Sequence, residues 1–480
     1  MRRKIEYVPL ARDIDTLGGR DLKGIEAECT NSAVRPLRDI NDWGTIDIEA
    51  LTMSLRSRLS NELSYALTTL TLLSTMRGPQ QGTGFPIMQC TDLFEEILDL
   101  LEEVAFHDTQ DSPSTPQEDD ALQVTNRELV TMIVDDESRP FAVSRESDFG
   151  PRQRPANVIL VISNLLRNFS LIFDNAKYMT QHDRVLSILF RLCSTTRHEA
   201  ELRPASPALS LGDLVALRKD VLYILVNTAP FIDLAQSNRS PALLIIAKRV
   251  FDLIASYLVD SSEAISPYAL VQLSGSLKPP SLADAALEVF TRMCQTDANR
   301  QVIAQVVSQP SIRRLFESLV HRLPVVDADF QLAVREIWLP YVEKTIMGIY
   351  SLAFLAPPGL KQVLKKDRKL GFKGVMLRMI RKFLWYPEHK NLMVAARRAT
   401  EAMKMLDDGE DTFDTGQTTT APILAFGMGY GEACDSGTER GTGLLGGHRD
   451  MAWEMLMHRE VLNDVVMFGE LESLARVEYA

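Results

Sequence analysis

One pattern occurs twice in this chain, at positions far apart. The first copy begins with LLRNFS at Leu165, continues through Asn175-Ala176-Lys177, and ends in an apolar helix around 185–189. The second begins with VFTRMC at Val289, continues through Asn299-Arg300, and ends in an apolar helix around 315–319. Such a unit cannot bury its apolar face alone, so it must stack on its neighbours. The repetition therefore predicts a stack of helical units, a fold that commonly binds partners rather than catalysing a reaction.

The order of elements within each copy is typical of an armadillo repeat. Each copy has a helix, a polar turn with Asn closely followed by a basic residue, a short helix and a longer apolar helix. Apolar residues recur at spacings of three and four over most of residues 156–406, and no convincing strand is predicted. We therefore expect an all-α fold: an armadillo-like helical-repeat solenoid with disordered insertions and a tethered C-terminal helix. Within 156–406 the helices are expected near 156–174, 182–195, 211–229, 241–259, 281–296, 298–308, 310–322, 329–355, 359–366, 370–384 and 388–406.

Composition along the chain predicts four regions: an irregular N-terminal segment (1–45), an armadillo-like helical core (46–406), an acidic and Gly-rich linker (407–450), and a C-terminal helix (451–480). The core is expected to open with one long helix over 46–76. It is also expected to contain disordered acidic insertions near 107–120 and 135–155, because these stretches have almost nothing to bury. A helix on a long tether must dock on its own solenoid or on a partner.

Charge is distributed unevenly over the 480 residues, whose net charge is −12. Residues 92–137 carry 15 acidic side chains and one Arg, a local net charge of −14. Residues 360–404 carry 13 basic and 3 acidic side chains, a local net charge of +10. An acidic chain with one basic block is a poor general DNA binder but can dock partners of both signs. The pairs Glu95-Glu96 and Glu102-Glu103 lie on a periodic helix and are expected to face solvent.

The basic block supplies the candidate partner-binding residues of this chain. One interpretation is a solvated helix-turn-helix face. The other is a patch that docks an acidic partner segment, with weak, salt-sensitive contact to DNA or a nucleosome; few aromatics interleave with the charges, so base stacking is not predicted. The candidates are Lys361, Lys365, Lys366, Arg368, Lys369, Arg378, Arg381 and Lys382.

Residue patterns that carry chemistry are absent from the sequence. The glycines at 427, 429 and 431 lack the Walker-type GxxxxGK[ST] and are followed by acids rather than a helix start. His198-Glu199 lacks the second histidine of a zinc motif, no CxxC occurs, and there is no Gly-x-Ser-x-Gly elbow. We therefore predict no catalytic, cofactor-binding or metal site, and no enzyme. No apolar run approaches the roughly 20 residues that span a bilayer, so no membrane partner is expected.

Several long stretches resemble a known family. They are KIEYVPLARDIDTLGGRDL (Lys4–Leu22), LSNELSYALTTLTLLS (Leu59–Ser74), MQCTDLFEEILDLLEEVAF (Met88–Phe106), NLLRNFSLIFDNAKYM (Asn164–Met179), GGHRDMAWEMLMHREVL (Gly446–Leu462) and FGELESLARVE (Phe468–Glu478). Together they resemble the C-terminal core-binding region of the large SWI/SNF chromatin-remodelling subunit that elsewhere carries an AT-rich interaction domain, in particular its fungal, Swi-one form.

The resemblance implies a nuclear scaffold that organises other remodelling subunits, including the ATPase, to regulate transcription. No separate basic helical module precedes Lys4, so the family's DNA-binding function is not carried over, and we expect either a partial sequence or a paralogue reduced to its assembly region. An armadillo-type adaptor that binds partner peptides outside chromatin remodelling stays open as an alternative. Such an adaptor predicts a groove lined by regularly spaced Asn and Trp, whereas Trp43, Trp338 and Trp385 are irregularly spaced.

Overall fold

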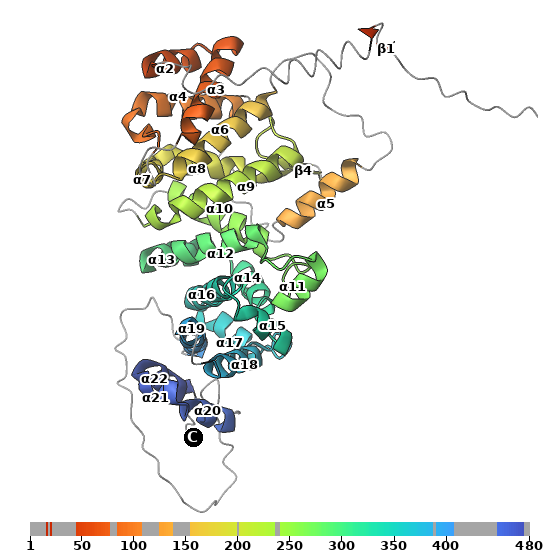
Figure 1. Ribbon diagram of the computed structural model, residues 1–480, viewed down its shortest axis with the longest axis vertical. Coiled ribbons are helices and arrows are strands. Elements are labelled where there is room, and N and C mark those ends of the chain that lie inside the picture. Colours follow the sequence, from red (N-terminus) through yellow and green to blue (C-terminus); the bar gives the residue numbers. More distant parts are fainter. Residues whose placement is uncertain are drawn as a thin grey trace, which may run out of the picture.

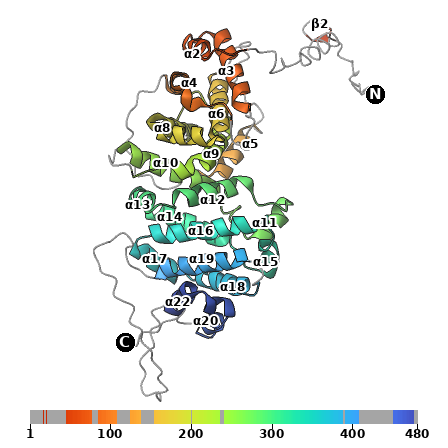
Figure 2. The same ribbon diagram turned by 60° about the vertical axis from the view of Figure 1, so that its left-hand side comes forward.

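The protein is a column of helices arranged in two rows (Figures 1 and 2). The computed structural model describes residues 16–17, 20–21, 45–76, 84–107, 124–137, 154–198, 201–235, 241–386, 390–407 and 449–474. In the first row, each helix packs on the next: α3 (Ser60–Thr75), α6 (Pro155–Ser170), α9 (Leu211–Thr228), α12 (Ser281–Met293), α16 (Leu339–Leu355), α19 (Lys390–Asp407) and α22 (Val465–Leu474). The second row runs alongside in the same way: α4 (Thr91–Phe106), α8 (Asp183–Leu192), α10 (Pro241–Leu258), α14 (Gln309–His321) and α17 (Pro358–Lys366).

A short element joins a first-row helix to the following second-row helix in three successive units. These connecting elements are α7 (Phe173–Gln181), η3 (Ala229–Phe231) and α13 (Asp297–Val306). The all-α helical-repeat prediction is confirmed by this architecture. Both copies of the sequence pattern are such units, α6–α7–α8 and α12–α13–α14, so the repetition marks equivalent positions in the stack.

The repeated asparagines perform the same structural task in both copies. Asn175, in the first turn of α7, donates from Nδ2 to the carbonyl of Phe85 at 2.9 Å. Asn299, in the first turn of α13, donates from Nδ2 to the carbonyl of Ile232 at 2.9 Å and accepts from the Leu234 N–H at 2.8 Å. Each asparagine therefore hydrogen-bonds backbone of the preceding unit that lies outside the α-helices.

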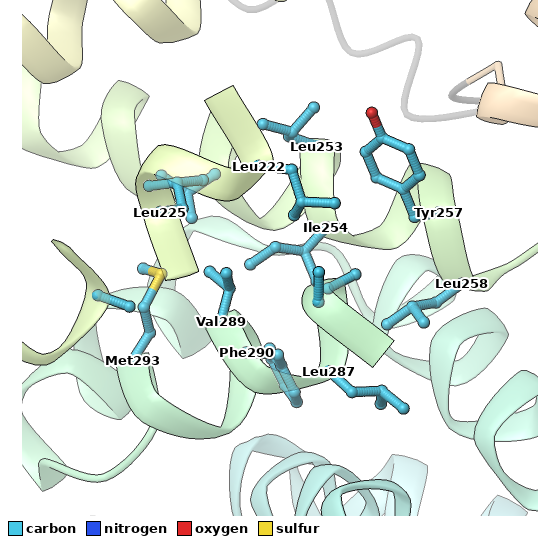
Figure 3. Packing of buried hydrophobic residues seen from close by; sticks show 14 of the residues in the cluster. Leu222, Leu225, Leu253, Ile254, Tyr257, Leu258, Leu287, Val289, Phe290 and Met293 are labelled. Carbon is cyan, nitrogen blue, oxygen red and sulfur yellow. The ribbon is translucent and has the colours of Figure 1, made fainter. Parts of the chain in front are cut away.

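Apolar contacts between the rows make one continuous core, which extends from Leu51 to Leu474. Figure 3 shows its middle, where side chains of α9, α10 and α12 meet. Phe290 of α12 lies there with its ring centroid 6.3 Å from that of Phe251 in α10, in an edge-on arrangement. Phe169 of α6 is fully buried as well, and its ring lies 5.9 Å from that of Phe85. The predicted helical register of residues 165–169 is therefore confirmed.

Side-chain hydrogen bonds link successive helices of the first row. The Asn168 amide donates to Ser74 of the previous helix at 3.0 Å, and the Asn227 amide donates to Ser170 at 3.0 Å. Further along, the Arg292 guanidinium donates to the Val226 carbonyl at 2.9 Å. Because each of these hydrogen bonds requires one particular residue of the preceding helix, they favour one register of packing between adjacent helices.

Several predicted helices are wrong in extent because tight turns interrupt them. The predicted helix over 46–76 is two helices, α2 (Ile48–Arg56) and α3, separated by Arg58 at a φ of 56°. The left-handed turn folds α2 back onto α3 and α4, and the Arg58 guanidinium donates to the Leu55 carbonyl at 2.7 Å. The predicted helix over 329–355 is likewise split into α15 (Asp327–Ala333) and α16, since Pro340 in the first turn of α16 prevents a continuous ladder.

Other elements were missed or assigned incorrectly. Helix α7 begins at Phe173, at the end of the predicted 156–174 helix, and fills the interval before the predicted 182–195 helix. Helix α11 (Pro267–Ser274) was not predicted, and the C-terminal helix is three short ones: α20 (Arg449–Leu456), α21 (Arg459–Asn463) and α22. Strands also occur, contrary to the prediction. The strands β3 (Thr195–His198) and β4 (Glu201–Pro204) pair in antiparallel register, as do β1 (Thr16–Leu17) and β2 (Arg20–Asp21).

The two predicted disordered insertions and the linker lie almost entirely outside the described residues, as does most of 1–45. Between the insertions, α5 (Asn126–Glu137) packs across α9 and α10 at the side of the column (Figure 1). Leu129 is its fully buried anchor.

Candidate partner-binding surface

The candidate basic residues lie on α17, on α18 (Phe372–Leu384) and on the turn between these helices. The prolines at 357 and 358 begin α17 because a proline suits the first turn of a helix, where its missing N–H is not needed. The turn that follows is closed by the Asp367 carboxylate, which accepts from the backbone N–H of Lys369 at 3.0 Å. Gly371 then takes a left-handed conformation, with a φ of 61°, at the start of α18.

Lys361 is not on the surface, and in this respect the predicted patch is wrong. Its side chain is fully buried, on the same face of α17 as Leu360 and Leu364. This face packs against α14 and α19. The sequence-based prediction put Lys361 on the surface because a count of charges does not show which face of a helix other helices will cover.

Four other candidates are held by carboxylates from distant parts of the chain. Lys365 pairs with Asp407 at the end of α19 at 2.7 Å. Arg378 and Lys382 share one carboxylate of α15, Asp327, at 3.2 and 3.0 Å. These ion pairs tie α17 and α18 to the helices around them, and part of the local excess of positive charge is neutralised there.

Arg381, the fourth, reaches to the C-terminal helices. Its guanidinium lies 2.9 Å from the Glu454 carboxylate of α20 and 5.6 Å from the ring centroid of Trp385. The Lys382 ammonium lies over the same ring at 5.7 Å. A cation over an indole face is attracted by the ring quadrupole. Arg381 therefore connects the end of α18 to α20.

Three candidates remain as an exposed cluster: Lys366, Arg368 and Lys369, which we call the basic turn. Asp367 lies among them in sequence, but it is partly buried and its carboxylate pairs with Arg313 of α14 at 3.1 Å. The basic turn therefore presents three positive charges to solvent while its nearest acid is directed inward.

The acidic stretch at the other end of the column differs from the prediction of a simple solvated face. Arg184 of α8 reaches three carboxylates of α4: Asp99 and Glu102, each at 2.7 Å, and Glu95 at 3.1 Å. Hydrogen bonds to Glu102 and then Asp99 hold the pKa of Arg184 above its usual range. Glu96 is buried and accepts from Arg56 at 2.7 Å. These carboxylates therefore connect helices within the stack.

Four large apolar residues near the basic block, three of them aromatic, were not predicted to contribute to a site. Trp385 and Tyr386 follow α18, and Trp453 and Met457 belong to α20 and the turn after it; all four are exposed. The sequence signal was the pair Trp-Tyr directly before Pro387, at the point where an apolar stripe ends.

A shallow groove of about 600 Å³ lies where the turn after α13 meets the turn after α16. Gln301, Gln305 and Gln309 line it together with Leu355 and Pro357. Its amides can donate and accept hydrogen bonds, but no acid, base or nucleophile among its lining residues is arranged for catalysis.

Metal ligands and reactive thiols do not gather in the part of the chain that the structure describes. No group of three or more His, Cys, Asp or Glu side chains there could hold a metal ion. Burial raises the pKa of both Cys193 and Cys294 to about 12, so these thiols stay protonated and are poor nucleophiles. Among the same residues, no helix has the length and apolarity required to cross a bilayer.

The architecture places the chain among all-α helical-repeat proteins, whose extended surfaces typically bind other macromolecules. No family model matches the sequence. The chain is similar to the SWI/SNF chromatin-remodeling complex subunit sol1 of Schizosaccharomyces pombe, with 22% identity over 327 residues. The match covers 63% of this chain and 36% of that protein, so the chain spans about a third of the length of this relative. The similarity supports a SWI/SNF-type subunit.

Proposed function

We propose that the chain is a non-catalytic scaffold subunit of a SWI/SNF-type, ATP-dependent chromatin-remodelling complex. In this role it works in the nucleus and organises other subunits, including the ATPase, along its helical rows to regulate transcription. The observation that carries the proposal is the continuous two-row stack in a chain similar to a subunit of such a complex. A long helical stack with one continuous core has extended surfaces at fixed distances from one another, and a subunit that holds other subunits in a complex requires such surfaces.

Within this role we propose the basic turn as one docking site for an acidic partner segment. Its three cations are exposed, and they lie in a block with a local net charge of +10. Lys361 has no part in the site because it is buried. The same cations can also make weak contact with the phosphates of DNA or a nucleosome, and the affinity of that contact would decrease steeply as the salt concentration rises.

Purification from nuclear extract tests the scaffold role directly. A tagged full-length chain should recover a remodelling ATPase and its companion subunits in stoichiometric amounts, as identified by mass spectrometry. Recovery of a different, non-nuclear assembly would favour the adaptor alternative. Recovery of no stable partner would contradict both.

Charge reversal tests the basic turn. Replacing Lys366, Arg368 and Lys369 by Glu should reduce recovery of one or more partners, most strongly at low salt, where exposed charges attract over longer distances. A matched control makes the same change at three dispersed, exposed cations, Lys177, Lys219 and Arg335. If both variants recover every partner as well as wild type does, the basic turn is only a solvated surface.

A further inference from the structure

Exposed aromatic side chains gather at the C-terminal end of the column. Of the four tryptophans in the chain, Trp338 is fully buried, whereas Trp385 and Trp453 are 58% and 57% exposed. Tyr386 and Met457 are 40% and 64% exposed. We call Trp385, Tyr386, Trp453 and Met457, three aromatic residues and one methionine, the aromatic patch. Large exposed apolar groups in one region of a soluble protein mark interaction surfaces more often than chance placement does.

The two halves of the aromatic patch are joined by one side chain. Arg381 lies over the Trp385 ring and pairs with Glu454, the residue next to Trp453 on α20. Trp453 and Met457 are four residues apart, so they lie on one side of this helical segment. Both views of the column place α18 and α20 beside each other at this end (Figures 1 and 2). The two halves of the patch therefore lie on either side of the seam between α18 and α20, which the Arg381–Glu454 ion pair bridges.

The composition of this surface is that of an interface centre. Trp, Tyr, Met and Arg are the residue types most enriched at protein interfaces, and Trp, Tyr and Arg dominate the residues whose truncation costs most. The surroundings are basic: Arg381 and Lys382 both lie over Trp385. The carboxylates that pair with them, Glu454 and Asp327, are themselves exposed, and exposed ion pairs exchange partners at little cost.

We propose that the aromatic patch docks an acidic amphipathic helix of a partner subunit. The apolar face of this helix would cover Trp385, Trp453 and Met457. Its flanking carboxylates would form ion pairs with Arg381 and Lys382 in place of Glu454 and Asp327. Two observations select this occupant: Arg381 and Lys382 over the Trp385 ring favour an acidic partner, and each first-row helix packs against the next helix of the row, from α3 to α22, so that a helix is the element this stack accepts. The identity of the occupant as a complex subunit rests on the proposed function, whereas its chemistry follows from the patch alone.

Site-specific photo-crosslinking in the assembled complex tests the proposal. A photoreactive phenylalanine analogue replaces Trp385 in one protein and Trp453 in another, and a third carries it at the exposed Lys219 as a background control. The expected result is that positions 385 and 453 crosslink to the same partner segment, one that has apolar residues at helical spacing and flanking acids. A basic or extended segment, the linker 408–448 of the same chain, a second copy of the chain, or no crosslink above background would overturn the proposal.

Substitution gives the quantitative test. Trp385→Ala and Trp453→Ala should each weaken association with the crosslinked subunit by about 30-fold or more, whereas Trp385→Tyr and Trp453→Tyr should keep most of the affinity. Because both tryptophans are largely exposed, the melting temperature of the free chain should not change, and this measurement excludes misfolding as the cause. If a remodelling complex assembles on wild type and on both Ala variants equally, the patch proposal fails while the scaffold function stands. If wild type assembles no such complex, the scaffold function fails first.

Discussion

Truncating the repeated asparagine of the second copy should cost more stability than truncating that of the first. Asn299 is buried and makes three backbone hydrogen bonds, to the Leu234 N–H at 2.8 Å and to the Ile232 and Met293 carbonyls at 2.9 and 3.1 Å. Leu234, Ile232 and Met293 are all buried residues, so Asn299→Ala leaves one buried donor and two buried acceptors unpaired. At about 1–3 kcal/mol for each such group, with partial rescue by water, we expect a loss of about 2–4 kcal/mol.

Asn175→Ala is the matched comparison. Asn175 makes one hydrogen bond to the carbonyl of Phe85, and its Oδ1 has no partner among the described residues. Phe85 is only partly buried, so solvent can replace the lost donor and the expected loss is about 1 kcal/mol. Asn299→Asp provides a second control, because it keeps the acceptor for Leu234 but sets a carboxylate against the other two carbonyls. It should destabilise at least as much as Asn299→Ala.

Urea unfolding and hydrogen exchange measure the two losses. Long repeat stacks need not unfold in one step, so the urea midpoint should be read together with exchange of the amides around residues 229–235, which report the local contact. The expected result is faster exchange there in Asn299→Ala and little change in Asn175→Ala. A loss below about 1 kcal/mol for Asn299→Ala, or equal losses for both variants, would refute the argument that the buried bonds hold adjacent units together.

Three further predictions concern the core, the C-terminal helices and DNA. Phe169→Ala should cost about 3–5 kcal/mol in chemical denaturation because the ring is fully buried; a loss below about 1 kcal/mol would contradict its role in the core. Burial, then the charge of Glu401, raises the pKa of Glu470 on α22 to about 7, and its Oε2 has no hydrogen-bond partner among the described residues. The folded state therefore holds a proton that the unfolded state releases near pH 4.5, so docking of α22 should weaken as pH rises from about 4.5 to 7. Glu470→Gln should remove this dependence, and exchange of the α22 amides at about pH 5 and pH 8, corrected for intrinsic rates, would measure it. Finally, a chain of net charge −12 should not distinguish AT-rich from GC-rich duplexes at about 150 mM salt, and tight binding with strong preference for one duplex in a titration would contradict the scaffold proposal.

The sequence predicted helices and their buried faces well where the signal was local. Spacings of three and four placed Leu165, Leu166 and Phe169 on one face, and all three are fully buried. The Asn-plus-basic pattern identified two equivalent turns, since a repeated backbone task selects the same side chain each time. Breaks without Gly or Pro were missed: nothing in the apolar pattern of 46–76 shows that Arg58 adopts a left-handed conformation.

The candidate surface was only partly predictable, because its character depends on partners far away in the chain. Asp327, Asp407 and Glu454 neutralise lysines and arginines that a local count treats as free. Composition and periodicity by themselves determined an all-α stack with one basic block, since both are properties of short segments. Tertiary structure alone decided that Lys361 is buried, that the basic turn is exposed, and that two tryptophans 68 positions apart in sequence share one end of the column. Stacking brings distant helices together, and these distant neighbours determine which charges are paired and which side chains remain exposed.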